Sequence, residues 1–303
     1  MNILVTGATG KVGTVFLEAL RRRGADLIRV ATPDPPPAGP DIDWVQTDFL
    51  EDLDFHSLTS KIDVVFHLAA ELYDISKMEQ VNCFATRQLA EASEQTGVRS
   101  FIYTSSTMVY GHPTSRLVTE ESPLLDANPF PFVNSLSSYA QSKFASEAAI
   151  RDVCKDVTYT ILRPTMLVNN IDLKRYAENW SYPRKLWWGH RLSHLIHVSE
   201  VAECLLRILN AADAKDYSNN GTITLYNLSS DDKGETFSDV FRHLAANSFP
   251  LYVTIPFGAY LEYAKDVVKH RGGSRGWPYG VVTYSGAKFE RAFGIVHDIT
   301  SAC

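Results

Sequence analysis

The chain has 303 residues, enough to bury a substantial hydrophobic core in one large domain or in a larger and a smaller one. Hydrophobic residues make up 45% of it and charged residues 21%, a balance typical of soluble globular proteins. The net charge of -6 is spread along the chain, which argues against nucleic acid or an anionic membrane surface as a partner.

Cysteines and apolar runs exclude two further classes. The four cysteines stand alone in the sequence, without a CxxC pair or histidines at metal-ligand spacing, so neither a disulfide framework nor a metal site is expected. They are Cys83, Cys154, Cys204 and Cys303. No basic leader precedes the first apolar segment, and no apolar run approaches the roughly 20 residues that span a bilayer. We therefore expect a cytoplasmic protein.

Strand-like and helix-like patterns alternate along most of the chain. Short apolar runs typical of strands occupy residues 2–6, 27–31, 43–47, 63–70, 100–106, 157–164 and 222–228. Amphipathic patterns typical of helices occupy residues 11–23, 78–95, 136–153 and 199–209. Such alternation predicts right-handed βαβ crossovers, and hence an α/β fold with a doubly wound parallel sheet of the Rossmann type.

The alternation weakens beyond Asn169, where residues 178–198 are rich in aromatic and basic side chains. We therefore predict a smaller, discontinuous C-terminal lobe that binds the substrate. The expected domains are a dinucleotide-binding domain at 1–168 and 193–229 and a substrate-binding lobe at 169–192 and 230–303. The segment "PDPPPAGP", residues 33–40, reads as a surface loop, because proline fixes φ and lacks an amide hydrogen.

A glycine-rich turn joins the first strand to the first helix. In "TGATGKVG", Gly7 can take the tight turn, Gly10 lets the backbone approach a pyrophosphate, and Gly13 permits close packing of the helix. Its position between a strand and a helix predicts dinucleotide binding. The contacts expected here are Gly7, Thr9, Gly10, Lys11, Val12 and Gly13.

The choice between NAD and NADP depends on the end of the second strand. Ala31 and Thr32 stand where an acidic residue would hold the ribose hydroxyls or an arginine would accept a 2′-phosphate, and Asp34 follows them. Either NAD or NADP is expected, with NAD favoured. Asp48, in "QTDFL", is expected to bond the adenine; the alternative is an N-cap for the next helix.

Nine short motifs, taken in chain order, match the motifs of a known superfamily in the same order. They are "TGATGKVG", "TDFL", "FHLAA", "QVNCFAT", "YTSSTMVYG", "TEESPL", "YAQSK", "LRP" and "HVSEVAE", spanning about residues 3–206. The chain resembles the extended short-chain dehydrogenase/reductase superfamily in its NAD-dependent epimerase/dehydratase branch. The resemblance implies an NAD(P)-dependent oxidoreductase or epimerase that acts on a secondary alcohol or ketone carbon.

Tyr139 and Lys143 are the predicted centre of that chemistry. Separated by four residues on a helix, they share one face. An ammonium near a phenol favours the phenolate, so we expect Lys143 to lower the pKa of Tyr139 and Tyr139 to act as the acid/base group. The resemblance implies that Lys143 also holds the nicotinamide ribose and that Ser106 bonds the substrate oxygen; Ser105 is the less favoured candidate.

Other positions are predicted as contacts. The remaining cofactor contacts expected are Asp48, Phe49, Leu68, Ala69, Ala70, Asn82, Thr104, Pro164 and Met166, besides Tyr139 and Lys143. The substrate contacts expected are Ser106, Thr107, Tyr139, Asn169 and Arg191. Two alternatives stay open, since Asn82 could bond the local backbone and the two alanines could pack the following helix. His197 is interpreted as structural.

The substrate is the least determined feature. Met166 replaces an asparagine that sugar-nucleotide enzymes of this branch commonly carry, and Ser193 and His194 replace an arginine–aspartate pair. A nucleotide sugar is favoured over a non-nucleotide hydroxy or keto metabolite, and a cofactor-binding regulator without catalysis is a third hypothesis. The tryptophans of residues 180–188 could stack on a ligand or on each other. The resemblance also implies a homodimer formed through the helices at 78–95 and 136–153.

Overall fold

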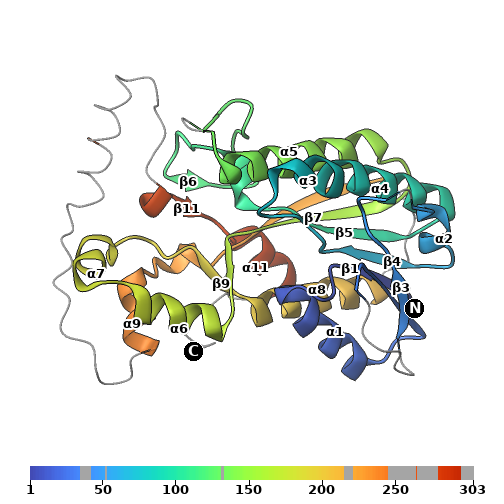
Figure 1. Ribbon diagram of the computed structural model, residues 1–303, viewed down its shortest axis with the longest axis horizontal. Helices are drawn as coiled ribbons and strands as arrows, with labels where there is room; N and C mark the ends of the chain where they lie inside the picture. Colours follow the sequence, from blue (N-terminus) through green and yellow to red (C-terminus); the bar gives the residue numbers. More distant parts are fainter. Residues whose placement is uncertain are drawn as a thin grey trace. The chain divides into compact units, whose positions relative to one another are not determined.

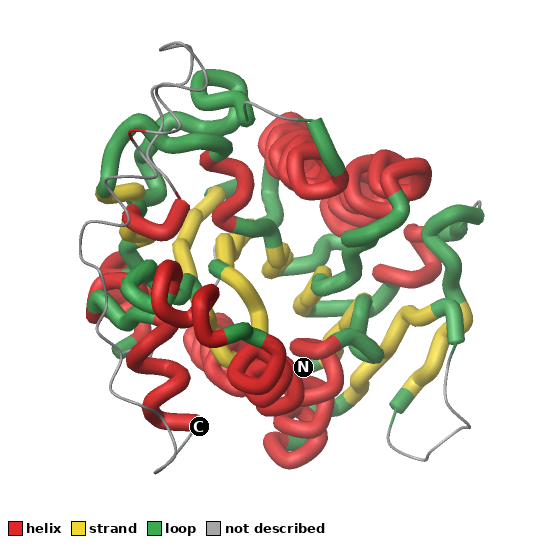
Figure 2. Tube along the Cα trace, turned by 60° about the vertical axis from the view of Figure 1, so that its left-hand side comes forward, coloured by secondary structure: helices red, strands yellow, loops and turns green. Residues whose placement is uncertain are grey.

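The computed structural model describes residues 1–34, 42–51, 53–130, 133–214, 221–244, 264 and 279–294, drawn in colour in Figure 2. Most of the predicted proline-rich loop and Cys303 lie outside them. The chain divides into two compact units. Unit 1 comprises Met1–Val109, Phe132–Arg163 and Val201–Tyr226, and unit 2 comprises Tyr110–Pro131, Pro164–Glu200 and Asn227–Cys303.

A seven-stranded sheet with the order β10-β7-β5-β4-β1-β2-β3 confirms the predicted fold class. Its strands are β1 (Asn2–Thr6), β2 (Leu27–Thr32), β3 (Asp43–Gln46), β4 (Val64–His67), β5 (Ser100–Thr104), β7 (Thr158–Pro164) and β10 (Ile223–Leu228). Neighbouring strands from β3 to β7 pair in parallel. The central strands β4 and β5 are buried along their whole length, as continuous apolar runs in a covered sheet require.

Helices cover both faces of this sheet. They are α1 (Lys11–Arg23), α2 (Phe55–Thr59), α3 (Ile75–Met78), the π-helical turn η1 (Glu79–Phe84), α4 (Ala85–Thr96), α5 (Ser135–Val153) and α8 (Val198–Ala214). Figure 1 shows α3, α4 and α5 on one face and α1 and α8 on the other. The predicted helix at 78–95 is thus interrupted by the π-helical turn, a local widening that periodicity alone does not reveal.

The topology sets the position of the predicted cofactor turn. Strand β1 lies between β2, which follows it directly in the chain, and β4, which is reached by a crossover from β3. The strand order therefore reverses beside β1, and in open α/β sheets ligands bind outside the carboxyl ends of the strands at such a point. Residues 7–10, which follow β1, lie at this position.

Unit 2 is built from short elements. They are β6 (Leu117–Val118), β8 (Met166–Val168), β9 (Leu195–His197), β11 (Thr283–Tyr284), α6 (Asn170–Asn179), α7 (Tyr182–Trp188), α9 (Phe237–Leu244) and α11 (Ala287–Phe293), with 3-10 turns η2 (Thr107–Tyr110), which begins in unit 1, η3 (Asp231–Lys233) and η4 (Tyr279–Val281). Strands β8 and β9 pair in parallel, and so do β11 and β6. Val168, Leu173, Leu195 and Val240 form a buried apolar cluster.

The units differ from the predicted domain boundaries in four segments. Residues 110–131, predicted in the dinucleotide-binding domain, group with unit 2. The same holds for residues 164–168, 193–200 and 227–229. The division into a cofactor-binding and a substrate-binding domain stays a prediction. In the described part of the chain, no helix has both the length and the apolar character that crossing a bilayer requires.

Candidate active site

The glycine turn has the geometry that its three glycines predict. Gly7 has φ of +71°, and a Cβ there would lie 2.5 Å from the backbone nitrogen of Ala69. A Cβ on Gly13 would lie 2.2 Å from the carbonyl oxygen of Gly7. A Cβ on Gly10 would meet only the Gly7 carbonyl oxygen, at 3.2 Å. Gly7 and Gly13 therefore serve the packing of the turn, while Gly10 leaves its backbone open to an approaching anion at the start of α1.

The end of β4 closes against this turn. The Leu68 amide donates to the Thr6 carbonyl at 3.2 Å, and the Ala69 amide approaches the Thr6 hydroxyl at 3.4 Å. Leu68, Ala69 and Ala70 are half-buried. The backbone of Leu68 and Ala69 thus joins the end of β4 to the end of β1, and the contact of these residues with a cofactor stays a prediction.

Asn82 makes the local contacts that were its alternative interpretation. Its amide nitrogen donates to the Glu71 carbonyl and to the Ser142 hydroxyl, each at 2.9 Å, and its oxygen accepts from the Glu71 amide at 2.7 Å. Asn82 is buried and lies in the π-helical turn η1. The side chain thereby joins the segment after β4 to α5. Its contact with a cofactor stays a prediction.

Asp48 does not cap the next helix. Its carboxylate accepts from the Leu50 amide at 3.0 Å, in a local turn, whereas α2 is capped by Asp54. The N-cap alternative for Asp48 is therefore wrong, because α2 begins at Phe55 and its cap lies six positions after Asp48. Phe49 is buried and stacks on Phe55 with ring centroids 5.9 Å apart, so its side chain belongs to the core.

Tyr139 and Lys143 lie on α5, which begins with a capping box formed by Asn134 and Ser137. Lys143 is only 1% exposed, and its Nζ donates to the Thr104 carbonyl, at the end of β5, at 2.7 Å. The same Nζ lies 5.9 Å from the centre of the Tyr139 ring. Helix α5 therefore brings the phenol and the ammonium to the carboxyl end of β5.

The pKa of Tyr139 is shifted in the direction opposite to the one expected. Burial raises the pKa of Tyr139 above its usual value near 10, and burial lowers the pKa of Lys143 to about 7 although Glu147 acts in the opposite direction. The expected lowering of the Tyr139 pKa by Lys143 is thus wrong for this structure. Desolvation of the phenol outweighs the attraction of an ammonium that is itself desolvated and directed at a backbone carbonyl.

The two candidate serines after β5 have different surroundings. The Ser105 hydroxyl donates to the Glu147 carboxylate at 2.7 Å, inside the core. The Ser106 hydroxyl accepts from the Met108 amide at 3.2 Å, at the start of the 3-10 turn. Ser105 is thus engaged by a buried carboxylate, whereas Ser106 keeps its hydroxyl hydrogen for another acceptor. The geometry favours the residue that the family resemblance implied.

Thr104 supplies a test of whether a ligand fits at this edge. Its hydroxyl oxygen is buried and has no hydrogen-bond partner among the described residues, a rare situation for a buried polar group. Together with the open backbone at Gly10, this hydroxyl fits a polar ligand lying across the carboxyl ends of β1 and β5. Thr107, also buried, begins the 3-10 turn η2, three residues after Thr104.

Four predicted contacts belong to unit 2, namely Pro164, Met166, Asn169 and Arg191. Asn169 is the N-cap of α6, where its side chain accepts from the Asp172 amide at 2.9 Å. Met166 lies in β8, and its sulfur accepts from the Tyr176 hydroxyl at 3.6 Å. Pro164 ends β7. Asn169 thus has a structural role that its sequence position did not predict, and its contact with substrate stays a prediction.

The aromatic and basic segment forms a stack within unit 2. Trp180 packs against Phe237 and Phe241, with centroid distances of 4.7 and 5.2 Å. The Arg184 guanidinium lies 4.4 Å from the Trp180 ring and 5.1 Å from the Trp188 ring. The Arg191 guanidinium lies 4.5 Å from the Trp188 ring. The rings therefore stack on each other and on arginines, one of the two interpretations left open.

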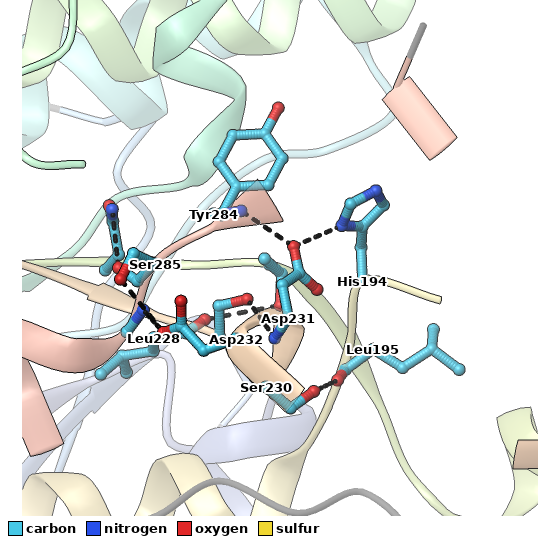
Figure 3. Close-up of polar contacts among 12 residues, drawn as sticks. His194, Leu195, Leu228, Ser230, Asp231, Asp232, Tyr284 and Ser285 are labelled. Carbon is cyan, nitrogen blue, oxygen red and sulfur yellow. Dashed lines mark hydrogen bonds and ion pairs between the residues drawn. The ribbon is translucent and has the colours of Figure 1, made fainter. Parts of the chain in front are cut away.

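Ser193 and His194 stand where the resemblance places an arginine–aspartate pair, and His194 contacts Asp231, a residue of another segment. His194 Nδ1 lies 2.6 Å from the Asp231 carboxylate, which also accepts from the Tyr284 amide at 3.1 Å (Figure 3). Both are buried, and His194 has φ of +51°. These contacts join three segments of unit 2, so the substitution has produced a structural centre of the unit. His197 bonds Ser199 and Asn170, in keeping with its interpretation as structural.

Sequence reasoning missed Glu147. It is fully buried on α5, eight residues after Tyr139, and it accepts from Arg163 Nε at 2.9 Å and Nη2 at 2.6 Å. A signal existed, since residues 139, 143 and 147 follow the spacing of one helix face. Among the described residues, His, Cys, Asp and Glu side chains form no group of three that could hold a metal ion.

Known proteins resemble both the sequence and the fold. Human dTDP-D-glucose 4,6-dehydratase is 31% identical over 181 residues, covering 54% of this chain and 49% of that protein. A 3-beta-hydroxysteroid dehydrogenase of Mycolicibacterium neoaurum is 32% identical over 120 residues, covering 36% of this chain and 32% of that protein. The chain thus spans half or less of the length of these relatives.

The fold has a solved counterpart. MoeE5 in complex with UDP-glucuronic acid and NAD superposes with a TM-score of 0.69 at 20% identity, over 98% of this chain and 94% of that one. The model of the NAD dependent epimerase/dehydratase family matches residues 3–223, which include the glycine turn, the serines after β5 and the Tyr139–Lys143 pair. The chain therefore belongs to the NAD-dependent epimerase/dehydratase family.

Proposed function

We propose that the protein is an NAD-dependent enzyme that transfers hydride at a secondary alcohol or ketone carbon of a nucleotide sugar, with Tyr139 as the acid/base group. The observation that carries the proposal is the convergence of Ser106, Tyr139 and Lys143 on the carboxyl end of β5. The glycine turn lies at the same edge of the sheet, after β1. The family and the nucleotide-sugar relatives support the substrate class.

The residues present fit NAD. The backbone at Gly7 and Gly10 and the start of α1 would hold the pyrophosphate, and Lys143 with Thr104 would meet the nicotinamide ribose. When bound, NAD supplies the acceptor and donor of hydride. Ala31 and Thr32, both buried, leave the end of β2 without a cation for a 2′-phosphate, which supports NAD over NADP.

Tyr139 would exchange the substrate proton. With a raised pKa it is a neutral phenol at neutral pH, able to donate to a ketone oxygen. In the oxidative direction Tyr139 would first lose its own proton to solvent, and the resulting phenolate, stabilised by the charge of Lys143, would then accept the substrate hydroxyl proton. Ser106 would hold the substrate oxygen in place by a hydrogen bond.

Direct assay tests this function. The purified protein is incubated with NAD and, separately, UDP-glucose, UDP-glucuronic acid and dTDP-glucose, and the sugar is followed by proton NMR for an epimer or a 4-keto product. A product with one of these sugars that depends on Tyr139 is expected. Turnover that fails with all of them while a hydroxysteroid is oxidised would overturn the substrate class.

A second candidate is oxidation or reduction of a non-nucleotide alcohol or ketone. It is favoured by Met166, which replaces an asparagine, and by Ser193 and His194, which replace the arginine–aspartate pair that the resemblance implies for nucleotide-sugar enzymes. The partial similarity to a hydroxysteroid dehydrogenase supports the same reading. Release of NADH during turnover distinguishes this candidate from an epimerase, which retains the cofactor.

The two serines give a prediction that separates catalysis from stability. Ser106→Ala should lower turnover by about 100-fold or more, because it removes a hydrogen bond to the reacting oxygen, with little change in stability. Ser105→Ala should instead lower the free energy of unfolding by about 1–3 kcal/mol, because Glu147 loses a buried hydrogen bond. Turnover and urea denaturation measure the two effects. If both variants lowered turnover and the free energy of unfolding by the same amounts, the separate roles given to Ser106 and Ser105 would be refuted.

We also infer a homodimer formed through α3, the π-helical turn and α5. Exposed apolar side chains lie on these elements or just before them, where soluble monomers seldom gather them. They are Leu72, Tyr73, Ile75, Phe84 and Leu136. Sedimentation velocity should show a dimer that Phe84→Glu converts to a monomer, whereas Leu117→Glu, at an exposed leucine of unit 2, leaves it intact. A monomeric wild type would refute the inference.

A further inference from the structure

Glu147 is the centre of a buried charged cluster behind the predicted acid/base pair. Its carboxylate accepts from the Ser105 hydroxyl at 2.7 Å, from both ends of the Arg163 guanidinium, and from Arg151 at 3.0 Å. The side chains of Glu147 and Arg163 are 0% and 1% exposed. Burial alone would raise the pKa of Glu147, but the hydrogen bond and charge of Arg163, with Ser105 and Arg151, hold that pKa below its usual value. The carboxylate is therefore ionised at neutral pH.

Three side chains of helix α5 lie at or near the carboxyl end of β5. Tyr139, Lys143 and Glu147 follow at intervals of four residues, so they share a face. Lys143 donates to the Thr104 carbonyl, and Glu147 accepts from the hydroxyl of the next residue, Ser105. The Ser105 amide donates in turn to Leu162 on β7, beside Arg163. Thr104 and Ser105 are thus each hydrogen-bonded to a side chain of α5, and the next residue in the chain is Ser106.

Within the described ranges, the aromatic and imidazole groups around Lys143 carry no negative charge. Its Nζ lies 4.6 Å from the centre of the Tyr103 ring on β5 and 5.9 Å from that of Tyr139 on α5. Burial raises the pKa of both tyrosines, so both are neutral. Burial, assisted by the charge of Lys143, lowers the pKa of His67 on β4 to about 3, so this imidazole is neutral as well.

Arg163, buried on β7, is the ion-pair partner of Glu147. Among the described groups that act on Lys143, Glu147 is therefore the anion that favours its charged form.

We propose that Glu147 is a positioning residue of the active site, which keeps Lys143 charged and, through Ser105, holds the end of β5 that carries Ser106. The inference rests on the proposed function, because it assigns Glu147 a role through residues placed in that reaction. The competing interpretation is that the Glu147–Arg163 ion pair only stabilises the packing of α5 against β7. Buried ion pairs often contribute little net stability relative to apolar side chains of similar size, so stability alone is a weak reason for this cluster.

Three variants separate these interpretations. Glu147→Gln removes the charge with little change in shape, but it leaves Arg163 buried without a carboxylate and could fail to fold. The double variant Glu147→Leu with Arg163→Met replaces the whole pair by apolar side chains and restores packing. Glu203→Gln is the matched control, because Glu203 forms an exposed pair with Arg207 at the same four-residue spacing on α8.

The main measurement is the titration of Lys143 itself, by NMR of protein with isotope-labelled lysine side chains and without added cofactor or substrate. The signal is assigned by its loss in Lys143→Arg. In the wild type we expect a transition near pH 7. In Glu147→Gln and in the double variant the transition should move to lower pH, since both variants remove the carboxylate whose charge favours the Lys143 ammonium. Glu203→Gln should leave it unchanged.

Turnover gives the second readout. Lys143 is charged below its pKa, so turnover that needs the ammonium falls as pH rises through this value, and the fall should move to lower pH in the double variant. An unchanged Lys143 titration in the folded double variant would overturn the proposal and leave only the fastening role. A shifted titration together with turnover that Lys143→Met leaves unchanged would retain the electrostatic link but refute the proposed function.

Discussion

Replacement of Tyr139 by phenylalanine is expected to lower turnover by about a thousandfold while cofactor affinity changes little. The phenol is the group placed beside Lys143 at the end of β5, and general acid–base catalysis is worth roughly 10²–10⁴ in rate. The ring itself stays, so the packing of α5 is preserved. Turnover is measured with the substrate identified by the NMR assay, and NADH affinity by fluorescence titration.

Tyr103→Phe is the matched control for this variant. It removes a phenol hydroxyl whose ring lies 4.6 Å from the same Lys143 ammonium, but from a side chain that is fully buried on β5. Turnover should stay within a few-fold of the wild type. Loss of turnover in Tyr103→Phe together with its retention in Tyr139→Phe would transfer the acid/base role to Tyr103.

Alanine substitutions in the glycine turn should produce the largest effects on cofactor binding. In Gly13→Ala the new Cβ would lie 2.2 Å from the Gly7 carbonyl oxygen and 2.5 Å from Ala8 Cα, both backbone atoms. Helix α1 must then shift away from the turn, at a cost of about 1–3 kcal/mol. We expect NADH affinity to fall by more than about tenfold and the melting temperature to fall with it.

Gly10→Ala separates binding from stability in the same turn. Its Cβ would meet one atom at 3.2 Å, so the fold should persist, while a methyl group would face the approaching pyrophosphate and weaken binding. Gly24→Ala is the control for backbone strain, since Gly24 has φ of +77° and open space around it at the end of α1. It should lower stability by about 1 kcal/mol without changing affinity. Unaltered NADH binding in Gly10→Ala and Gly13→Ala would show that this turn is not the anion site.

Local sequence signals determined most of unit 1. The predicted helix at 11–23 has the bounds of α1, and the predicted strands at 2–6 and 100–106 correspond to β1 and β5. Strand and helix periods record which faces are buried, and they are therefore readable wherever both faces of a sheet are covered. The glycine spacing and the tyrosine–lysine spacing depend only on neighbouring residues, so they too could be read from the chain.

What the sequence left open was decided by contacts between distant residues. The family motif favoured Ser106 over Ser105, but the bond of Ser105 to Glu147, which lies 42 residues away, could not be read from the sequence. The role of Asn82 follows from Glu71 and Ser142 in the same way.

The sign of the Tyr139 pKa shift was also inaccessible to the sequence, because spacing places an ammonium near the phenol but says nothing about how deeply both are buried. Charge pairing can be read from spacing. Desolvation is a property of the whole packed unit, and only the tertiary structure determines it.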